Sequence, residues 1–136
     1  MKQNTTNKKI GNDFESFFCE LLFSNGFWVH NLAQNQAGQP ADVIAVRNEK
    51  AFLIDCKDCI DDRFVLSRVE ENQHLAMELW EQCGNGQGWF AIKIEGEIYM
   101  IDYGAIRHLS KTIRSLKIRD MTYLGIPIGE WVKMCK

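Results

Sequence analysis

Three charged residues near the middle of the chain have the types and the spacing that metal-assisted chemistry requires. Asp42 begins one apolar segment, and Asp55 and Lys57 end the next, within the stretch Ala41–Lys57 (ADVIAVRNEKAFLIDCK). Side chains alternate between the two faces of a strand, so Asp55 and Lys57 share one face. The polar residues Asn48-Glu49 between the two segments predict a hairpin turn.

The register of this predicted hairpin sets two carboxylates against each other. If Val46 pairs with Ala51 across the turn, Asp42 lies directly opposite Asp55. Like charges that face each other on a sheet are destabilising. A cation between them would remove this effect. Lys57 supplies one positive charge, and a divalent metal would supply the rest.

This arrangement suits metal-assisted hydrolysis of a phosphodiester. Carboxylate oxygens are hard ligands that favour Mg²⁺ or Mn²⁺. Such an ion lowers the pKa of a bound water and offsets charge on the transition state, and Lys57 would orient the water or neutralise the phosphate. A second interpretation needs no metal: Asp42 and Lys57 form a cross-strand ion pair, and Asp55 is solvated at a strand end.

The surrounding sequence predicts the elements that would position these residues. A helix from Asn12 to about Asn25 has an apolar stripe bordered by Glu15, and a strand over Phe27–Leu32 follows it. A second helix over about Ser67–Cys83 carries Gln73 on its inward stripe, and a second hairpin spans residues 89–103. The element order is therefore α-β-β-β-α-β-β, followed by a C-terminal tail, which predicts a mixed α/β fold.

Length and composition predict one domain. The chain has 136 residues, of which 46% are hydrophobic and 25% charged, as in ordinary globular proteins. We expect residues 1–136 to form a single domain, with residues 1–10 flexible and residues 104–136 as a C-terminal extension. No apolar run approaches the roughly 18 residues of a membrane helix, and the polar N-terminus lacks a signal sequence, so we expect a cytoplasmic protein.

The cysteines and histidines offer weaker candidates for a site. Five cysteines at irregular spacing predict reduced thiols. The pair Cys56-x-x-Cys59 has the spacing of a zinc or redox pair, but a second such pair or a matching histidine pair is absent from the sequence. We therefore interpret Cys56 as a buried thiol and Cys59 as a loop thiol. The three histidines are isolated, and His74 is interpreted as a helix-surface residue rather than a general base.

A basic tract in the C-terminal part is the second functional feature. The segment from Tyr103 to Arg119 has no acidic residue and contains five basic ones: Arg107, Lys111, Arg114, Lys117 and Arg119. A helix over Ala105–Arg114 and a strand over Ser115–Arg119 would place them on one surface, as expected for binding a phosphate backbone. A simply solvated face is the alternative. Near the N-terminus, Lys8 and Lys9 would add a flexible basic arm.

The two acidic segments and the helices with Glu15 and Gln73 resemble the motifs of the PD-(D/E)xK nuclease superfamily. The resemblance is strongest to its RecU-type and archaeal-type Holliday-junction resolvases. The matching segments are GNDFESFFCELL, QPADVIAV, AFLIDCK and VEENQHLAMELW, within residues 11–103. The resemblance implies a restriction-endonuclease-like core, with a mixed central sheet flanked by helices. It further implies a Mg²⁺-dependent (or Mn²⁺-dependent) endodeoxyribonuclease that acts on branched DNA in recombination and repair, as a homodimer that cuts two symmetric strands.

The resemblance also implies a role for each site residue. Asp42 and Asp55 would be metal ligands, Lys57 the catalytic lysine, Glu15 an accessory acid near the metal, and Gln73 a positioning residue. The chain departs from the pattern in two places: Ala41 separates Pro40 from Asp42, and the second acid is Asp where resolvases usually have Glu.

The connection before the first acid bears on the choice of substrate. The segment Asn31–Ala41 leaves little room for the long projection of RecU-type enzymes. Two alternatives therefore remain open. One is another nuclease of this superfamily, of restriction or repair type, and the other is a non-catalytic DNA-binding protein that keeps the fold.

Overall fold

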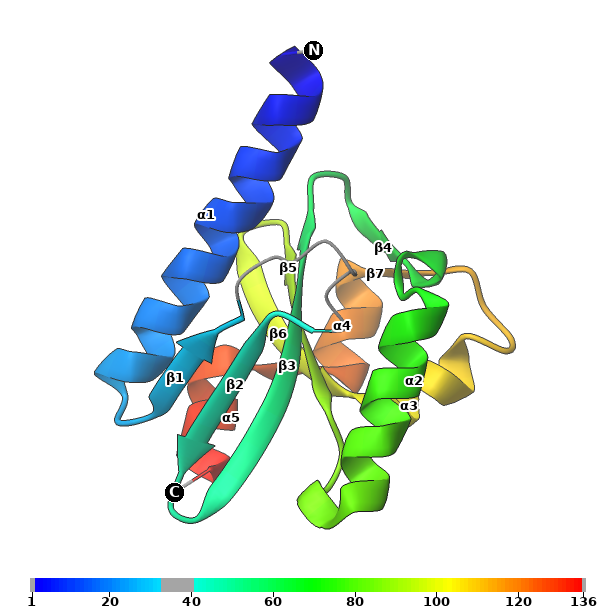
Figure 1. Cartoon of the computed structure of the whole chain (residues 1–136). Helices are drawn as coiled ribbons and strands as arrows, with labels where there is room; N and C mark the ends of the chain where they lie inside the picture. The colour runs from blue at the N-terminus through cyan, green and yellow to red at the C-terminus, as the bar shows by residue number, and fades with distance from the viewer. Residues whose placement is uncertain (1, 33–40, 136) are drawn as a thin grey trace.

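The computed structural model describes the backbone of residues 2–32 and 41–135 and the side chains of residues 13–32 and 41–135. A six-stranded sheet in the order β1-β2-β3-β5-β6-β8 forms its centre, with helices on both faces (Figure 1). Only the β3–β5 pair is parallel, so the sheet is mixed and mostly antiparallel. The predicted fold class is confirmed. No helix in the described part of the chain has the length and apolar character needed to cross a membrane.

The elements follow the predicted order, with additions after the first hairpin and near the C-terminus. The strands of the main sheet are β1 (Trp28–Asn31), β2 (Val43–Arg47), β3 (Lys50–Cys59), β5 (Trp89–Ile94), β6 (Glu97–Asp102) and β8 (Ile126–Pro127). A separate two-stranded sheet joins β4 (Arg63–Val65) to β7 (Ser115–Lys117). The helices are α1 (Lys2–Ser24), η1 (Leu66–Arg68), α2 (Glu71–Trp80), η2 (Glu81–Asn85), α3 (Tyr103–Leu109), α4 (Ile118–Leu124) and α5 (Ile128–Met134).

Two apolar clusters hold the layers together, one on each face of the sheet. On one face, Phe18 of α1 and Trp131 of α5 pack with Ile54 of β3. On the other face, helices α2, α3 and α4 cover strands β3, β5 and β6, with Met77 and Phe90 fully buried. Burial on both faces explains why the central strands read as continuous apolar runs.

The first hairpin forms in the predicted register. Val46 pairs with Ala51, and the two turn residues, Asn48 and Glu49, both have positive φ (51° and 66°). Such a two-residue turn matches the twist of the strands that flank it. Strand β3 continues to Cys59, two residues beyond the predicted end at Lys57.

Three predicted details of the helices are wrong. Helix α1 begins at Lys2 rather than at Asn12, so residues 2–10 are helical and do not form a separate lead-in. Helix α2 begins at Glu71 rather than at Ser67, because a short 3₁₀ helix and an extended residue precede it. Helix α2 ends at Trp80 rather than at Cys83, and Cys83 is exposed in η2, which follows it.

The C-terminal residues are an integral part of the fold and not an appended extension. Strand β8 pairs with β6, and α5 places Trp131 in the core, where it is 0% exposed. Its ring stacks on Phe27 at a centroid distance of 5.8 Å and makes edge contacts with Phe52 (5.1 Å) and Trp89 (5.7 Å). This aromatic cluster joins the C-terminus to β3 and β5.

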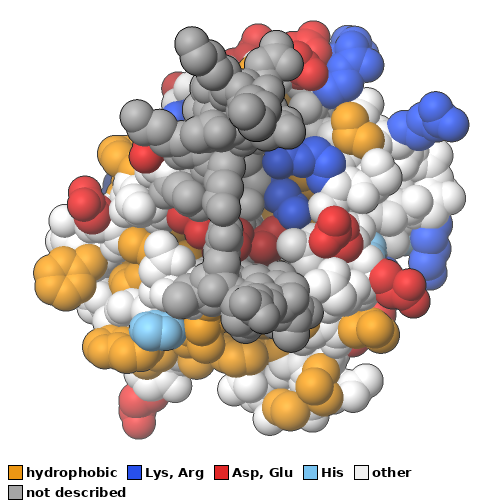
Figure 2. All heavy atoms as spheres, turned by 45° about the horizontal axis from the view of Figure 1, so that its top comes forward, with side chains coloured by type: hydrophobic (Ala, Val, Ile, Leu, Met, Phe, Trp, Pro, Cys, Tyr) orange, Lys and Arg blue, Asp and Glu red, His pale blue; other side chains and the backbone are white. Residues whose placement is uncertain are grey.

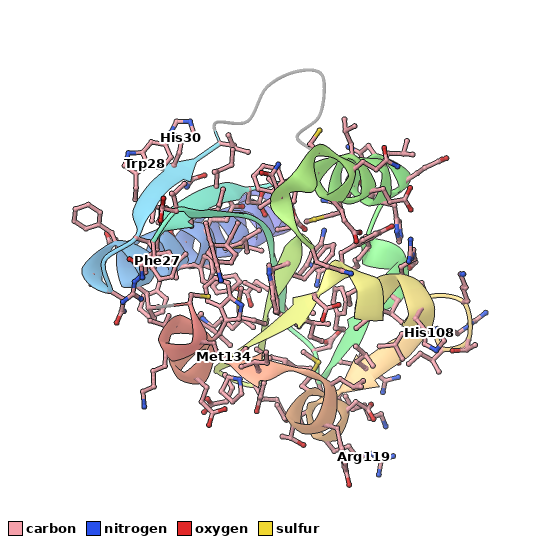
Figure 3. All side chains as sticks on the ribbon, turned by 90° about the horizontal axis from the view of Figure 1, so that it is seen from below. Phe27, Trp28, His30, His108, Arg119 and Met134 are labelled. Atoms are coloured by element: carbon pink, nitrogen blue, oxygen red, sulfur yellow. The ribbon has the colours of Figure 1, made fainter. Side chains whose placement is uncertain are left out.

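The aromatic cluster predicts a large effect of Trp131→Ala on stability. Removing a fully buried tryptophan leaves a cavity, and we expect a loss of about 3–5 kcal/mol in the free energy of unfolding. Urea unfolding followed by circular dichroism measures this. Trp28→Ala is the matched control, because Trp28 is 61% exposed and projects outward from β1 (Figure 3). Equal losses in the two variants would contradict this description of the core.

Candidate active site

A cleft of about 460 Å³ opens where β3 passes the start of β2. All five residues predicted from the two motifs and their neighbouring helices line it: Glu15, Asp42, Asp55, Lys57 and Gln73. Asp58, Asp61 and Arg68 line it as well. Figure 2 shows acidic side chains near the centre of this face, with Lys and Arg side chains beside them.

The hairpin places the two predicted metal-binding carboxylates opposite each other. Val43 pairs with Ile54, and one further step of the same register brings Asp42 opposite Asp55. The Asp42 backbone N–H donates to the carbonyl of Ile54 (3.1 Å). The Asp42 carboxylate, through Oδ2, accepts the backbone N–H of Cys56 (2.7 Å). These two bonds fix the backbone and the side chain of Asp42 against β3.

Asp55 is a charged residue in a buried position. It lies on β3 between two neighbouring strands and is 1% exposed. Burial raises the pKa of its carboxyl well above the ordinary value, the nearby Lys57 ammonium opposes this, and the Asp42 carboxylate adds to it. Among the described residues no hydrogen-bond donor is aligned with Asp55 Oδ2, although the Lys57 ammonium lies 3.1 Å from it.

Lys57 and Gln73 complete a small polar network around Asp55. The Lys57 ammonium donates to the carbonyl of Arg68 (3.0 Å) and to Oε1 of Gln73 (3.1 Å). The Gln73 amide, through Nε2, donates to Asp55 Oδ1 (3.4 Å). Gln73 thus contacts both charged residues of the second motif, which is the position that the sequence predicted for it.

The start of α2 explains why Gln73 points into the cleft. Glu70 precedes the helix with extended backbone angles, and its free N–H donates to Gln73 Oε1 (3.1 Å). A glutamine at the third helical position often folds back in this way to satisfy the N-cap amide. The same oxygen then accepts from Lys57, so the helix start and the site share one side chain.

Glu15 reaches the cleft from the opposite layer of the molecule. It lies on α1 beside the buried Phe14 and Phe18 and is half-buried. Burial, and secondarily the negative charge of Asp42, raise the pKa of Glu15 to about 7, while Lys57 lowers it. Electrostatic interaction with both Asp42 and Lys57 places this carboxyl in the same charge cluster.

The chemistry of these donors fits a hard divalent cation. Two facing carboxylates and a third nearby are oxygen ligands of the kind that Mg²⁺ takes. Asp55 Oδ2, buried with no aligned donor in the described structure, is an atom that a cation would satisfy. As the described side chains stand, no three His, Cys, Asp or Glu residues are grouped tightly enough to hold a metal ion. A metal would therefore need Glu15, or water, to complete its ligands.

The Cys56-x-x-Cys59 pair does not form a joint site. Both residues lie on β3, three positions apart, so they face opposite sides of the sheet, Cys56 toward α1 and Cys59 toward α2. Both are free thiols. Cys59 was predicted to be in a loop, which is wrong because β3 extends to include it.

The predicted basic surface is divided among several elements. Helix α3 ends at Leu109, so the part of Ala105–Arg114 beyond it is not helical, and Lys111 and Arg114 lie in the turn before β7. Lys117 lies in β7, but Arg119 projects outward from α4 rather than from a strand (Figure 3). All five tract residues are exposed, although they do not share one regular face. The side chains of Lys8 and Lys9 lie outside the described residues, as does the connection over residues 33–40.

Two residues have surroundings that the sequence did not reveal. Arg68 lines the cleft, and its position depends on the 3₁₀ helix η1, for which the sequence has no clear signal. His74, predicted to lie on the helix surface, is half-buried and bonded through Nδ1 to the Tyr103 hydroxyl (2.8 Å). That hydroxyl donates to Glu78 (3.0 Å), so His74 belongs to a contact between α2 and α3.

Comparison with known proteins identifies the family of this chain. The model of the archaeal Holliday junction resolvase (Hjc) family matches residues 6–136 of this chain. The fold is similar to the crystal structure of Hjc, a Holliday junction resolvase from the archaeal hyperthermophile Archaeoglobus fulgidus, with a TM-score of 0.70 and 16% identity over 90% of this chain and 99% of that one. No curated protein matches the sequence.

The family match spans both acidic strands of the cleft, the two helices that add Glu15 and Gln73, and the C-terminal elements that complete the sheet. It includes the stretch from residue 104 onward, which the motifs alone did not connect to any family. This chain belongs to the archaeal Holliday junction resolvase family and is an endonuclease of branched DNA.

Proposed function

We propose that this resolvase cuts DNA with the help of Mg²⁺, or Mn²⁺, held by Asp42 and Asp55, with Glu15 as an accessory ligand. The observation that carries the proposal is the pair of carboxylates set opposite each other by the hairpin register, one of them almost completely buried. When bound, the ion would lower the pKa of a water and offset charge on the phosphate.

The remaining residues of the network act on the nucleophile and the phosphate. Lys57 would donate to the attacking water or to the scissile phosphate, and a cation held by Asp42 and Asp55 would supply the positive charge that Lys57 provides beside Asp55 in this structure. Gln73 holds Lys57 and Asp55 in their relative positions through its two bonds. A displacement of about 1 Å in such a group lowers the rate by roughly 10²-fold, so Gln73 is a positioning residue.

A resolvase must cut two strands, and the described part of one chain contains a single acidic cleft of this kind. A homodimer would bring two such clefts to one junction, and we propose this assembly. Contacts to the DNA backbone are assigned to the exposed basic residues and to the N-terminal lysines: Arg107, Lys111, Arg114, Lys117, Arg119, Lys8 and Lys9.

The decisive test compares substrates and metals. Purified protein is incubated with a four-way junction, a linear duplex and a single strand, each with Mg²⁺, with Mn²⁺ or with EDTA. We expect cleavage of the junction only when a metal is present. Asp55→Ala should lower the rate by roughly 10³-fold or more, because it removes a ligand that is essential for the charge of the site, while junction binding persists.

Two outcomes would count against the proposal in different ways. Undiminished junction cleavage in EDTA would disprove the metal dependence. Cleavage of the linear duplex at the same rate would instead favour the alternative of a restriction-type or repair-type nuclease. Asp13→Ala is the control for Asp55→Ala. Asp13 is exposed on the same helix as Glu15, so its loss should leave the cleavage rate unchanged.

The raised pKa of Glu15 predicts that Mg²⁺ stabilises the protein more at pH 8 than at pH 6. Folding raises this pKa from 4.5 to about 7, so the stabilisation present at low pH is lost as the pH rises through 7. A divalent cation would offset the repulsion between the ionised carboxylates above that pH. Calorimetric melting with and without Mg²⁺ at the two pH values measures the difference. The prediction would be refuted if Mg²⁺ raised the melting temperature equally at pH 6 and pH 8, or if it raised that of Asp55→Asn as much as that of wild type.

The proposed dimer predicts the product of a mixed complex. Wild-type and Asp55→Ala chains are co-expressed with different tags and purified through both tags. We expect such complexes to nick a plasmid that carries a cruciform without linearising it, whereas wild-type protein linearises it. If no doubly tagged complex is recovered, the dimer is excluded. If mixed complexes linearise the plasmid as wild type does, the assumption that each cleft of the dimer cuts one strand is wrong.

A further inference from the structure

The small sheet formed by β4 and β7 carries two cations that face each other. Arg63 pairs with Lys117 in the register of this sheet. Their side chains point outward, because the alternating neighbours Phe64 and Leu116 are fully buried. Like charges at directly opposed positions destabilise a sheet. As with the acidic pair in the cleft, the arrangement is explained most simply by a ligand of opposite charge.

The protein itself neutralises little of this charge. Arg63 lies 3.3 Å from Asp62, but the two side chains are 46% and 61% exposed, and pairs of this kind contribute little in water. The Asp120 carboxylate accepts the backbone N–H of Lys117 (2.8 Å), but among the described residues no carboxylate lies within ion-pair distance of the Lys117 ammonium. Both cations are therefore available to an external anion.

Arg68 links this pair to the active site. It lies in η1, three residues after β4 ends, and lines the cleft. Its guanidinium is held by one edge, since Nη1 donates to the Asp58 carbonyl (3.1 Å) and lies 3.7 Å from Cys59 Sγ. The guanidinium carbon also lies 5.9 Å from the centre of the Phe64 ring. In the described structure no carboxylate pairs with it, and Arg68 is exposed where it lines the cleft.

The chain connects the cleft and the small sheet without interruption. Ile60 and Asp61, which follow β3, line the cleft, and β4 begins two residues later. In Figure 1, β4 and β7 lie beside the end of β3 from which this loop leaves. The three cations therefore extend from the cleft wall onto the adjoining outer surface. A ligand with negative charges repeated along its length, such as a sugar-phosphate backbone, matches this arrangement.

We propose that Arg68, Arg63 and Lys117 form the phosphate-binding path by which the DNA backbone leaves the active site. Arg68 binds a phosphate beside the scissile one, and the Arg63–Lys117 pair binds the backbone farther out. This inference rests on the proposed function and deepens it, since two of the three residues lie outside the basic tract. Contacts to phosphates carry no base preference, so the path acts equally on all sequences.

The test measures junction binding without cleavage. Arg68→Ala, the double variant Arg63→Ala/Lys117→Ala, and the control Lys133→Ala on the exposed side of α5 are titrated against a fluorescent four-way junction in EDTA. The salt concentration is varied from about 50 to 200 mM. Because the proposed homodimer carries each residue twice, we expect the slope of log Kd against log salt to fall by roughly two for Arg68→Ala and roughly four for the double variant. Lys133→Ala should leave the slope unchanged.

Two further readouts separate binding from folding and from catalysis. Because the Arg63–Lys117 pair is repulsive, the double variant should keep or raise the melting temperature of the protein. With Mg²⁺ and saturating enzyme, Arg68→Ala should cut more slowly by roughly tenfold or more, because the phosphate beside the scissile one is no longer held in position, and Arg68→Lys should restore part of the rate.

The outcomes distinguish this inference from the proposed function. If wild-type protein binds the junction but never cuts it with metal, the proposed function fails. The slopes of log Kd against log salt would still show whether Arg68, Arg63 and Lys117 bind phosphates. If the double variant and Arg68→Ala have the slope and Kd of wild type, the path is wrong, whatever the cleavage result. A decrease as large in Lys133→Ala would equally overturn it, since the effect would then be one of net charge.

Discussion

The repulsion between Asp42 and Asp55 is the constraint on which the site depends. The hairpin fixes them opposite each other, and the position of β3 inside the sheet removes one of them almost entirely from water. A buried carboxylate needs a compensating charge or must take up a proton. In the described structure Lys57 provides that charge, and two bonds, to the Arg68 carbonyl and to Gln73, hold it there. Lys57 thus offers one positive charge to two carboxylates, and the buried oxygen of Asp55 has no aligned donor in the described structure.

This arrangement also assigns a function to the layers on both faces of the sheet. Glu15 comes from the α1 side, whereas Gln73 and Arg68 come from the α2 side. Neither layer alone completes the cleft. The C-terminal helix α5 buries Trp131 against β3 and β5, so residues far from the chemistry hold the strand that carries Asp55 and Lys57. Asp55 lies on a central strand, and Asp42, directly before β2, is bonded to that strand through its backbone and its side chain, which keeps the two acids at a fixed separation.

The sequence was sufficient to predict the hairpin register, because a two-residue turn and alternating side chains leave little freedom in the pairing. The apolar stripes of the two helices were also sufficient to place Glu15 and Gln73 on elements that reach the cleft. It was not sufficient for elements whose geometry depends on distant contacts. Strand β4 pairs with β7, some fifty residues later, and the N–H of Leu66 at the start of η1 donates to the carbonyl of Arg114, directly before β7. The β4–β7 pairing is what sets Arg63 opposite Lys117. The predicted exposure of the basic tract is correct, but a helix as far as Arg114 does not form, since α3 stops at Leu109.

The proposed cleavage chemistry depends on a divalent cation that binds between Asp42 and Asp55. Anomalous diffraction from crystals of the protein bound to a junction and soaked in Mn²⁺ tests this most directly. We predict an anomalous peak in contact with the carboxylates of both Asp42 and Asp55, with the Lys57 ammonium moved away from Asp55. Crystals with well-ordered DNA in the cleft, no peak at this position and Lys57 still paired with Asp55 would contradict the account.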